Sequence, residues 1–173
     1  MGLIPEWIPV FQAPGTDVVV QQWLRPDGQV WWRVCPSAQQ LAGAVAVLVS
    51  AEGKVLLVRQ NRPAVGQVLW ELPRGGALAE DGDAVATATR ELYEETGFEA
   101  SDPVSYGVTY PDSGLLGSEV GVVRLSLGPA TGTPDGETEG WAWFSPHQLR
   151  DLVVEGSLRD SMSLAALVIA GIF

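Results

Sequence analysis

Three carboxylates and an arginine lie close together in residues 90–97, the stretch of this sequence best suited to chemistry. Glu91 directly follows Arg90, and Glu94 and Glu95 come one helical turn later. Residues three and four apart share a face of a helix, so these carboxylates converge and repel one another. A hard divalent cation such as Mg²⁺ or Mn²⁺ prefers oxygen ligands of this kind. The spacing therefore indicates a cation site; a solvated acidic face with Arg90 as ion-pair partner is the alternative.

The residues around this stretch predict the element that positions it. We expect a helix over residues 83–96, capped at its start by Asp81 or Asp83 and ended by Gly97. A strand that runs into a glycine turn is expected at residues 70–76. The apolar residues of the helix recur at helical spacing; they are Ala84, Val85, Ala88 and Leu92. The carboxylates are thus predicted on the face opposite this buried stripe.

Residues 76–98 resemble the box of the Nudix hydrolases, in which a glycine, a glutamate and an Arg-Glu-x-x-Glu-Glu core recur at fixed spacing. The residues in register are Gly76, Arg90, Glu91, Leu92, Glu94, Glu95, Gly97 and Phe98. One position departs from the pattern, because Gly82 stands where the first glutamate is expected. Asp81 and Asp83 flank this position and are candidates to take over part of its role.

The resemblance implies an α+β fold for residues 41–173, a Nudix-like α/β/α sandwich with a mixed sheet. Residues 1–40 are expected to form a small N-terminal β module, because an Asp-Gly turn joins two β-rich runs at residues 17–24 and 29–34. A helix is expected to begin at Ser145 and to end at Gly156. A last helix near residue 160 should turn apolar side chains inward, with a dimer surface at its apolar end as the alternative; these side chains are Leu164, Leu167 and Val168.

Residues 58–63 and 70–75 resemble the ADP-ribose pyrophosphatase branch of this family. This resemblance implies hydrolysis of ADP-ribose to AMP and ribose 5-phosphate with Mg²⁺ or Mn²⁺. The implied metal ligands are Glu91, Glu94, Glu95 and the backbone carbonyl of Gly75. Arg90 would hold the carboxylates in place, with Glu94 assisting catalysis. A loop glutamate serves as general base in this branch; Glu119 is the candidate, and an ordinary carboxylate at a strand edge is the alternative.

The same resemblance implies substrate contacts outside the box. Arg62 and Glu71 are the candidates near the phosphates, with a surface ion pair as the alternative for Arg62. In relatives, an aromatic residue of the N-terminal module stacks on adenine across a homodimer, which makes Trp31 and Trp32, and also Trp23, candidates. The alternative is that these tryptophans pack in a core or a dimer interface.

The composition excludes some partners. The chain carries 21 acidic and 10 basic side chains, for a formal net charge of −11, which argues against nonspecific binding of nucleic acid. Cys35 is the single cysteine, so no internal disulfide forms and a reducing cytoplasm is the expected location. The longest apolar runs, at residues 41–49 and 164–173, are too short to span a bilayer, and no membrane partner is expected.

Three functions remain open from the sequence. The first is the metal-dependent hydrolysis of ADP-ribose. The second keeps the chemistry but acts on a nucleotide sugar, NADH or a dinucleoside polyphosphate. The third is a nucleotide-binding domain with weak or lost catalysis. The departure at Gly82 favours this function, whereas the retained carboxylates argue against it; these are Glu91, Glu94 and Glu95.

Overall fold

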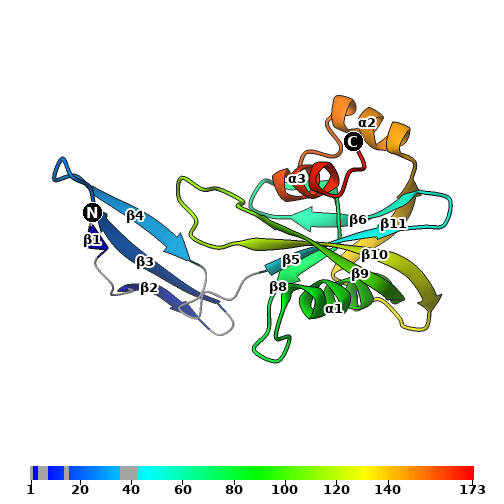
Figure 1. Cartoon of the computed structure of the whole chain (residues 1–173), viewed down its shortest axis with the longest axis horizontal. Coiled ribbons are helices and arrows are strands. Elements are labelled where there is room, and N and C mark those ends of the chain that lie inside the picture. The colour runs from blue at the N-terminus through cyan, green and yellow to red at the C-terminus, as the bar shows by residue number, and fades with distance from the viewer. Residues whose placement is uncertain (1, 4–7, 14–15, 36–42) are drawn as a thin grey trace.

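The computed structural model describes residues 2–3, 8–13, 16–35 and 43–173. It has two parts, an N-terminal β module and a larger domain that begins at β5 (Figure 1). The boundary predicted at residue 40 lies outside the described residues and stays a prediction. No described helix is long and apolar enough to cross a membrane.

The N-terminal module is a small antiparallel sheet built around one long strand. Its strands are β1 (Gly2–Leu3), β2 (Ile8–Ala13), β3 (Thr16–Leu24) and β4 (Val30–Cys35), and β3 pairs with each of the others. The turn between β3 and β4 contains Gly28 at φ +81°, a conformation that glycine adopts at little cost. The predicted hairpin is therefore confirmed.

The larger domain contains a seven-stranded mixed sheet with the strand order β11-β6-β5-β10-β9; β7 pairs with β6, and β8 with β5. The central pair, β5 and β10, is parallel, and the other pairs are antiparallel. The strands are β5 (Gly43–Val49), β6 (Val55–Arg62), β7 (Gln67–Glu71), β8 (Arg74–Gly76), β9 (Phe98–Thr109), β10 (Val120–Ala130) and β11 (Thr138–Phe144).

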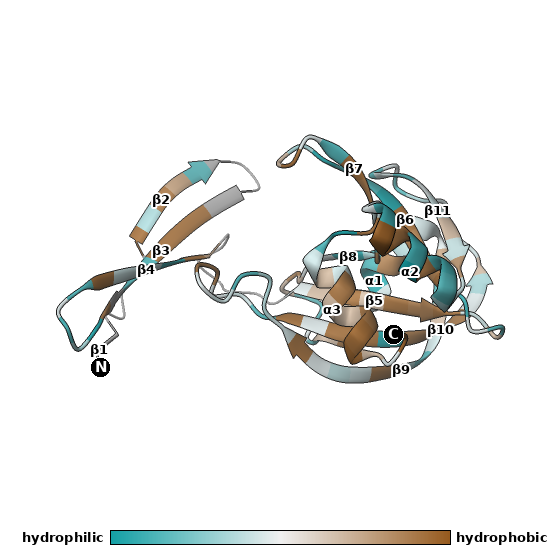
Figure 2. Ribbon diagram, turned by 90° about the horizontal axis from the view of Figure 1, so that it is seen from above, coloured by the Kyte–Doolittle hydropathy of each residue, from teal (hydrophilic) through white to brown (hydrophobic). Residues whose placement is uncertain are grey.

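Helices cover both faces of this sheet. Helix α1 (Ala84–Thr96) lies on one face, and α2 (Pro146–Glu155) and α3 (Ser161–Ile169) lie on the other (Figure 1). Side chains alternate along β5, so each face has its own core: Ala46 and Leu48 pack with α1, and Val45 and Val47 pack with α2 and α3. The hydrophobic colouring of β5 and of much of α3 reflects this burial (Figure 2). The predicted α/β/α sandwich is confirmed.

The helix ends follow their capping residues. Asp83 accepts a hydrogen bond from Ala86 N at 2.8 Å, and Gly97 ends α1 in the left-handed conformation. Ser145 forms a capping box at the start of α2, as expected. One prediction is wrong: Val168 is 60% exposed, because the inward face of α3 is formed by Ser163, Ala166 and Leu167.

Candidate active site

The three glutamates of α1 differ in their exposure to solvent. The side chain of Glu94 is 42% exposed and that of Glu91 is 13% exposed, whereas Glu95 is buried. The sequence placed all three on an outward face, which is wrong for Glu95. The loop between β10 and β11 and the first residue of β11 contact this end of the helix: Asp135 N donates to Glu94 O at 2.8 Å, and Thr138 Oγ1 donates to Glu95 O at 3.2 Å.

Arg90 connects the glutamates to the loop before the helix. Its Nη1 donates to Glu91 Oε1 at 2.9 Å and to Glu94 Oε2 at 2.7 Å. Its Nη2 donates to the carbonyl oxygen of Gly76 at 2.8 Å. Charge-assisted hydrogen bonds of this kind are short and strong. Arg90 therefore fixes the positions of two carboxylates and leaves Glu95 outside its reach.

Asp81, next to the position where the box has its first glutamate, binds Arg90. It accepts hydrogen bonds from Arg90 Nε at 3.0 Å and Nη2 at 2.9 Å, from Thr87 Oγ1 at 3.0 Å and from Leu78 N at 2.8 Å. The hydrogen bonds from Arg90, followed by that from Leu78, hold the pKa of Asp81 well below its usual range. Gly82 itself has φ +77°, so the chain turns there and brings the preceding carboxylate to Arg90. Asp83 does not share this role, because it caps α1.

Glu95 is a carboxylate with too few partners. Its Oε2 is buried and has no hydrogen-bond partner among the described residues. Burial raises the pKa of Glu95 to about 8, and the nearby charge of Glu91 adds to this effect, while Arg62 and Arg74 oppose it. Burial also raises the pKa of Glu91. Such destabilised carboxylates suit a bound cation, which would supply the missing positive charge.

Gly75 is required beside Glu91. A Cβ atom at residue 75 would overlap the carboxylate of Glu91, while the backbone at the next residue, Gly76, has open space. The carbonyl oxygen of Gly75 lies on the side of Gly43, where an added Cβ would come within 2.6 Å of it. The backbone of Gly75 thus lies against one predicted ligand, and its own role as a ligand stays a prediction.

The donor set fits a hard cation in its chemistry, although the ligands are not assembled around one point. Across the described ranges, no three Asp, Glu, His or Cys side chains are grouped closely enough to hold a metal ion. Glu91 and Glu94 both form ion pairs with the guanidinium of Arg90. The fit rests on Glu91 and Glu95, which lie one turn apart on α1, and on the unpaired oxygen of Glu95.

Arg62 and Glu71 form a close ion pair. Arg62 Nε lies 3.1 Å from both carboxylate oxygens of Glu71, and Arg62 Nη2 lies 2.6 Å from Glu71 Oε2. Glu71 is 1% exposed, whereas the side chain of Arg62 is 30% exposed. Glu71 is thus an internal anchor, and Arg62 is the member of the pair that a ligand can reach.

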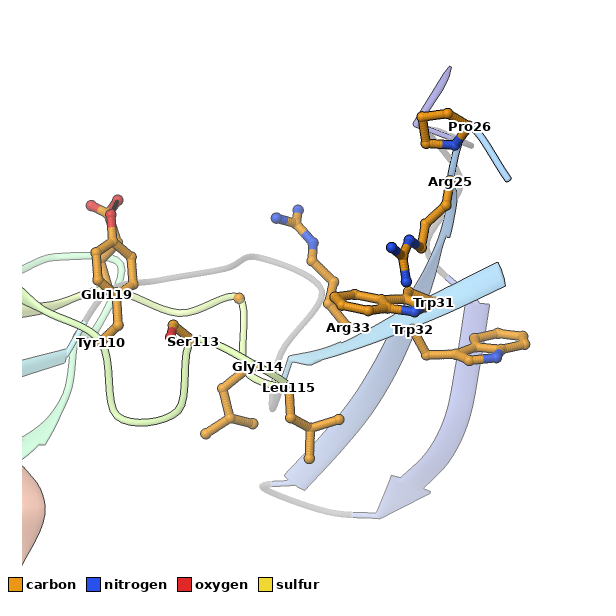
Figure 3. Close-up of a pocket in the computed structure, with 12 residues that line it drawn as sticks. Arg25, Pro26, Trp31, Trp32, Arg33, Tyr110, Ser113, Gly114, Leu115 and Glu119 are labelled. Atoms are coloured by element: carbon orange, nitrogen blue, oxygen red, sulfur yellow. Dashed lines mark hydrogen bonds between the residues drawn. The ribbon is translucent and has the colours of Figure 1, made fainter. Parts of the chain in front are cut away.

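Glu119 and the tryptophans lie at another place. Glu119 Oε1 accepts a hydrogen bond from the hydroxyl of Tyr110 at 2.7 Å. It lines an open pocket of about 770 Å³ together with Trp31 and Trp32, and none of the described lining residues belongs to α1. Figure 3 shows Glu119 and Tyr110 on one side of the pocket and the module's arginines and tryptophans on the other. The side chain of Trp23 lies outside what the structure describes.

The sequence reasoning missed two acidic residues of the loop between β10 and β11. The charge of Glu137 contributes to the raised pKa of Glu91, and that of Asp135 contributes to the raised pKa of Glu95. Both residues are exposed and close enough to influence the two carboxylates of α1. Their loop is rich in Gly, Pro and Thr. The acidic residues that interrupt this composition just before β11 are the sequence feature that could have pointed to them.

Comparisons with known proteins bear on the family of this chain. Residues 40–163 match the family model of the NUDIX domain. An ADP-ribose pyrophosphatase of Bacillus subtilis (strain 168) is 33% identical over 107 residues, which cover 61% of this chain and 56% of that protein. The phosphatase NudJ of Escherichia coli (strain K12) is 46% identical over 56 residues, 32% of this chain and 35% of that protein. The chain thus spans about half or less of the length of these curated relatives.

The fold has a solved counterpart as well. A crystal structure described as that of an ADP compounds hydrolase superposes with a TM-score of 0.76 and covers 98% of this chain and 91% of its own. The two sequences are 17% identical, so the similarity concerns the fold. The family match extends over most of the chain and includes the whole Arg-Glu-x-x-Glu-Glu core. This chain belongs to the Nudix family.

Proposed function

We propose that this protein is a pyrophosphohydrolase that cleaves nucleoside diphosphates linked to another moiety, with Mg²⁺ or Mn²⁺ as cofactor. ADP-ribose is the favoured substrate, and AMP and ribose 5-phosphate are the products. The observation that carries the proposal is the pair Glu91 and Glu95 on one face of α1, with a buried oxygen of Glu95 that lacks a partner. The B. subtilis relative, described as an ADP-ribose pyrophosphatase, supports the choice of substrate.

Each residue of the site has a proposed task. Glu91 and Glu95 hold the cation, with Glu94 and the Gly75 carbonyl as further ligands. When bound, the cation neutralises phosphate oxygens and activates water for attack. Arg90 orients the carboxylates through its hydrogen bonds to Glu91 and Glu94.

Arg62 binds a phosphate oxygen of the substrate, since guanidinium groups match phosphate geometry. Glu71 supports it from the interior through their close ion pair. The residue that accepts a proton from the attacking water must lie near Glu91 and Glu95. The electrostatic influence of Glu137 on Glu91 favours Glu137 for this role. Glu119, the candidate from the sequence, is engaged by Tyr110 and lies in the pocket beside the N-terminal module.

Two variants distinguish these bases. Glu137→Gln should lower kcat by about a hundredfold if Glu137 is the base, and Glu119→Gln should then mainly raise KM. The reverse pattern would assign the base to Glu119. Both glutamates are exposed, so the melting temperature serves as a control for the fold and should stay within about 2 °C of wild type.

A homodimer is the proposed assembly. The N-terminal sheet has few buried side chains of its own, and isolated small sheets need a covered apolar face to be stable. Large apolar side chains are exposed on the module and on β9; they include Ile8, Val10, Phe11, Val30, Trp31, Trp32, Val104, Tyr106 and Val108. We propose that a second copy covers these residues and that, as the resemblance implies, Trp31 or Trp32 of one copy stacks on adenine bound by the other. Sedimentation at micromolar concentration tests the dimer.

The decisive experiment is a substrate panel with purified protein. ADP-ribose, a nucleotide sugar, NADH and a dinucleoside polyphosphate are incubated with Mg²⁺ or Mn²⁺, and the products are separated by chromatography. We expect AMP from ADP-ribose, no product in the presence of EDTA, and no product from the Glu95→Gln variant. Nucleotide binding without any product would reject the hydrolase and favour a binding domain.

A further inference from the structure

Four charged side chains of alternating sign run from the candidate site to the start of α3. Arg62 Nη2 and Arg74 Nη2 lie 2.6 Å and 2.9 Å from the same oxygen of Glu71, Oε2. Arg74 Nη2 also lies 3.3 Å from Asp160 Oδ1. The side chains of Glu71, Arg74 and Asp160 are all less than one fifth exposed. The series therefore carries two positive and two negative charges in a poorly solvated place.

Asp160 has two contacts of different kinds. Its Oδ2 caps α3 by accepting hydrogen bonds from Ser163 N and Ser163 Oγ, both at 2.8 Å, while its Oδ1 faces Arg74. Ser163 Oγ in turn accepts a hydrogen bond from Leu72 N at 2.9 Å. The cap needs only an oxygen, whereas the contact with Arg74 needs a charge. The two contributions of Asp160 can thus be separated by substitution.

Arg74 lies where its charge reaches the acidic cluster. It directly precedes Gly75, where an added Cβ would overlap the carboxylate of Glu91. The charges of Arg62 and Arg74 both act on Glu95. Arg74 Nε is buried and has no hydrogen-bond partner within the described ranges, which is costly. Arg74 is held in this position by the ion pairs of its Nη2 with Glu71 and Asp160, although its Nε makes no hydrogen bond to a described residue.

We infer that Asp160 is a positioning residue for the site: acting through Arg74, its charge offsets the two arginines and thereby sets how strongly Glu91 and Glu95 attract a divalent cation. Without Asp160, the remaining side chains of Arg62, Glu71 and Arg74 would carry one net positive charge beside Glu95, which would oppose the binding of a cation. Without Arg74, the remaining side chains of Arg62, Glu71 and Asp160 would carry one net negative charge, which would favour the binding of a cation. The inference rests on the cation site of the proposed function and concerns its regulation by α3.

The test is a titration of the full-length protein with Mn²⁺, followed by electron paramagnetic resonance, in four variants. Asp160→Asn keeps an oxygen for the cap, since Asn caps helices about as well as Asp, and removes the charge. We expect its Kd for Mn²⁺ to rise by about tenfold, a modest effect for one unit charge in a partly buried setting. Arg74→Gln should lower the Kd, and the double variant should return within about threefold of wild type.

Asp151→Asn is the matched control. It makes the same chemical change on α2, where Asp151 is half exposed and lies 3.9 Å from His147. Its Kd for Mn²⁺ should stay within about twofold of wild type, because an exposed charge is screened by salt. Melting temperatures of all variants show whether an altered Kd reflects lost folding. Asp160→Asn should melt below wild type, because it removes one acidic partner of the poorly solvated Arg74, so Mn²⁺ is titrated well below its melting transition.

A Kd that moves in the same direction for Asp160→Asn and Arg74→Gln, or that moves for neither, would overturn the inference. Failure of the proposed function looks different: wild-type protein would bind Mn²⁺ and the variants would shift as expected, but no member of the substrate panel would be cleaved. If wild type hydrolyses ADP-ribose but the variants keep the wild-type Kd for Mn²⁺, the proposed function stands and the role of Asp160 is rejected. Absence of Mn²⁺ binding by wild type would reject both.

Discussion

The contact between Gly75 and Glu91 leads to a sharp prediction for Gly75→Ala. A Cβ at residue 75 would overlap the carboxylate of Glu91. That carboxylate is the end of a flexible side chain, so it would move by roughly 1.4 Å to restore an ordinary contact of about 3.5 Å. The backbone at residue 75 has no positive φ, so alanine itself is tolerated there. The fold should survive while the ligand is displaced.

The expected loss follows from the displacement. A catalytic group misplaced by about 1 Å costs on the order of a hundredfold in rate, which corresponds to about 2.7 kcal/mol. The effect on stability is the sum of a small overlap cost and a gain of about 0.4–1 kcal/mol from the less flexible unfolded chain. We therefore expect kcat for ADP-ribose to fall by about a hundredfold, with the melting temperature within a few degrees of wild type.

Gly76→Ala is the matched control, because a Cβ at residue 76 meets nothing within 4 Å. The assay is the rate of AMP formation at saturating Mg²⁺, combined with Mn²⁺ titration of both variants. Wild-type activity and Mn²⁺ affinity in Gly75→Ala would refute the placement of Glu91 as a ligand. An equal loss in both variants would show that β8 as a whole, rather than the carboxylate, is sensitive.

Three further changes test the loop before α1 and the buried glutamate. Gly82→Glu restores the family pattern but places a side chain at φ +77°, so thermal unfolding should show a loss of about 1–2 kcal/mol and no gain in kcat. Asp81→Asn removes the charge that holds Arg90, and kcat should fall by about tenfold while Mn²⁺ still binds; unchanged kcat would contradict this role. In metal-free protein, the pKa of Glu95 near 8 lies above its usual value of 4.5, so the unfolded state binds fewer protons and stability falls as the pH rises from about 4.5 to 8. Glu95→Gln should lack this fall in urea unfolding with EDTA, and parallel curves for the two proteins would argue against a buried, unpaired carboxylate.

Local chemistry was enough to predict the helix ends and the turns. Asp83, Ser145 and Gly97 act within one turn of their own positions, through a side-chain oxygen or a left-handed backbone. The hairpin at Gly28 has the same character. Such features depend on neighbours in sequence, so a single sequence contains the information.

Features that depend on distant segments were not predicted. Glu95 is buried at the end of α1, where Asp135 and Thr138, distant in sequence, contact the backbone of the helix, and nothing near residue 95 signals this. Asp81 and Asp83 were both candidates to replace the missing glutamate of the box, and no contact between either aspartate and Arg90 was predicted. The contact of Asp81 with Arg90 depends on how the chain turns at Gly82. Glu137 approaches Glu91 only once β10 and β11 are placed in the sheet.

The parallel pairing of β5 with β10 has a consequence for how the chain folds. All of α1 lies between these two strands in sequence, yet its apolar face packs on both of them. A nascent chain that ends before Ser126 lacks part of the surface on which the box helix rests. Closing such a long loop is entropically slow, so the acidic helix should acquire its final position late, after the local hairpins of the N-terminal module have formed.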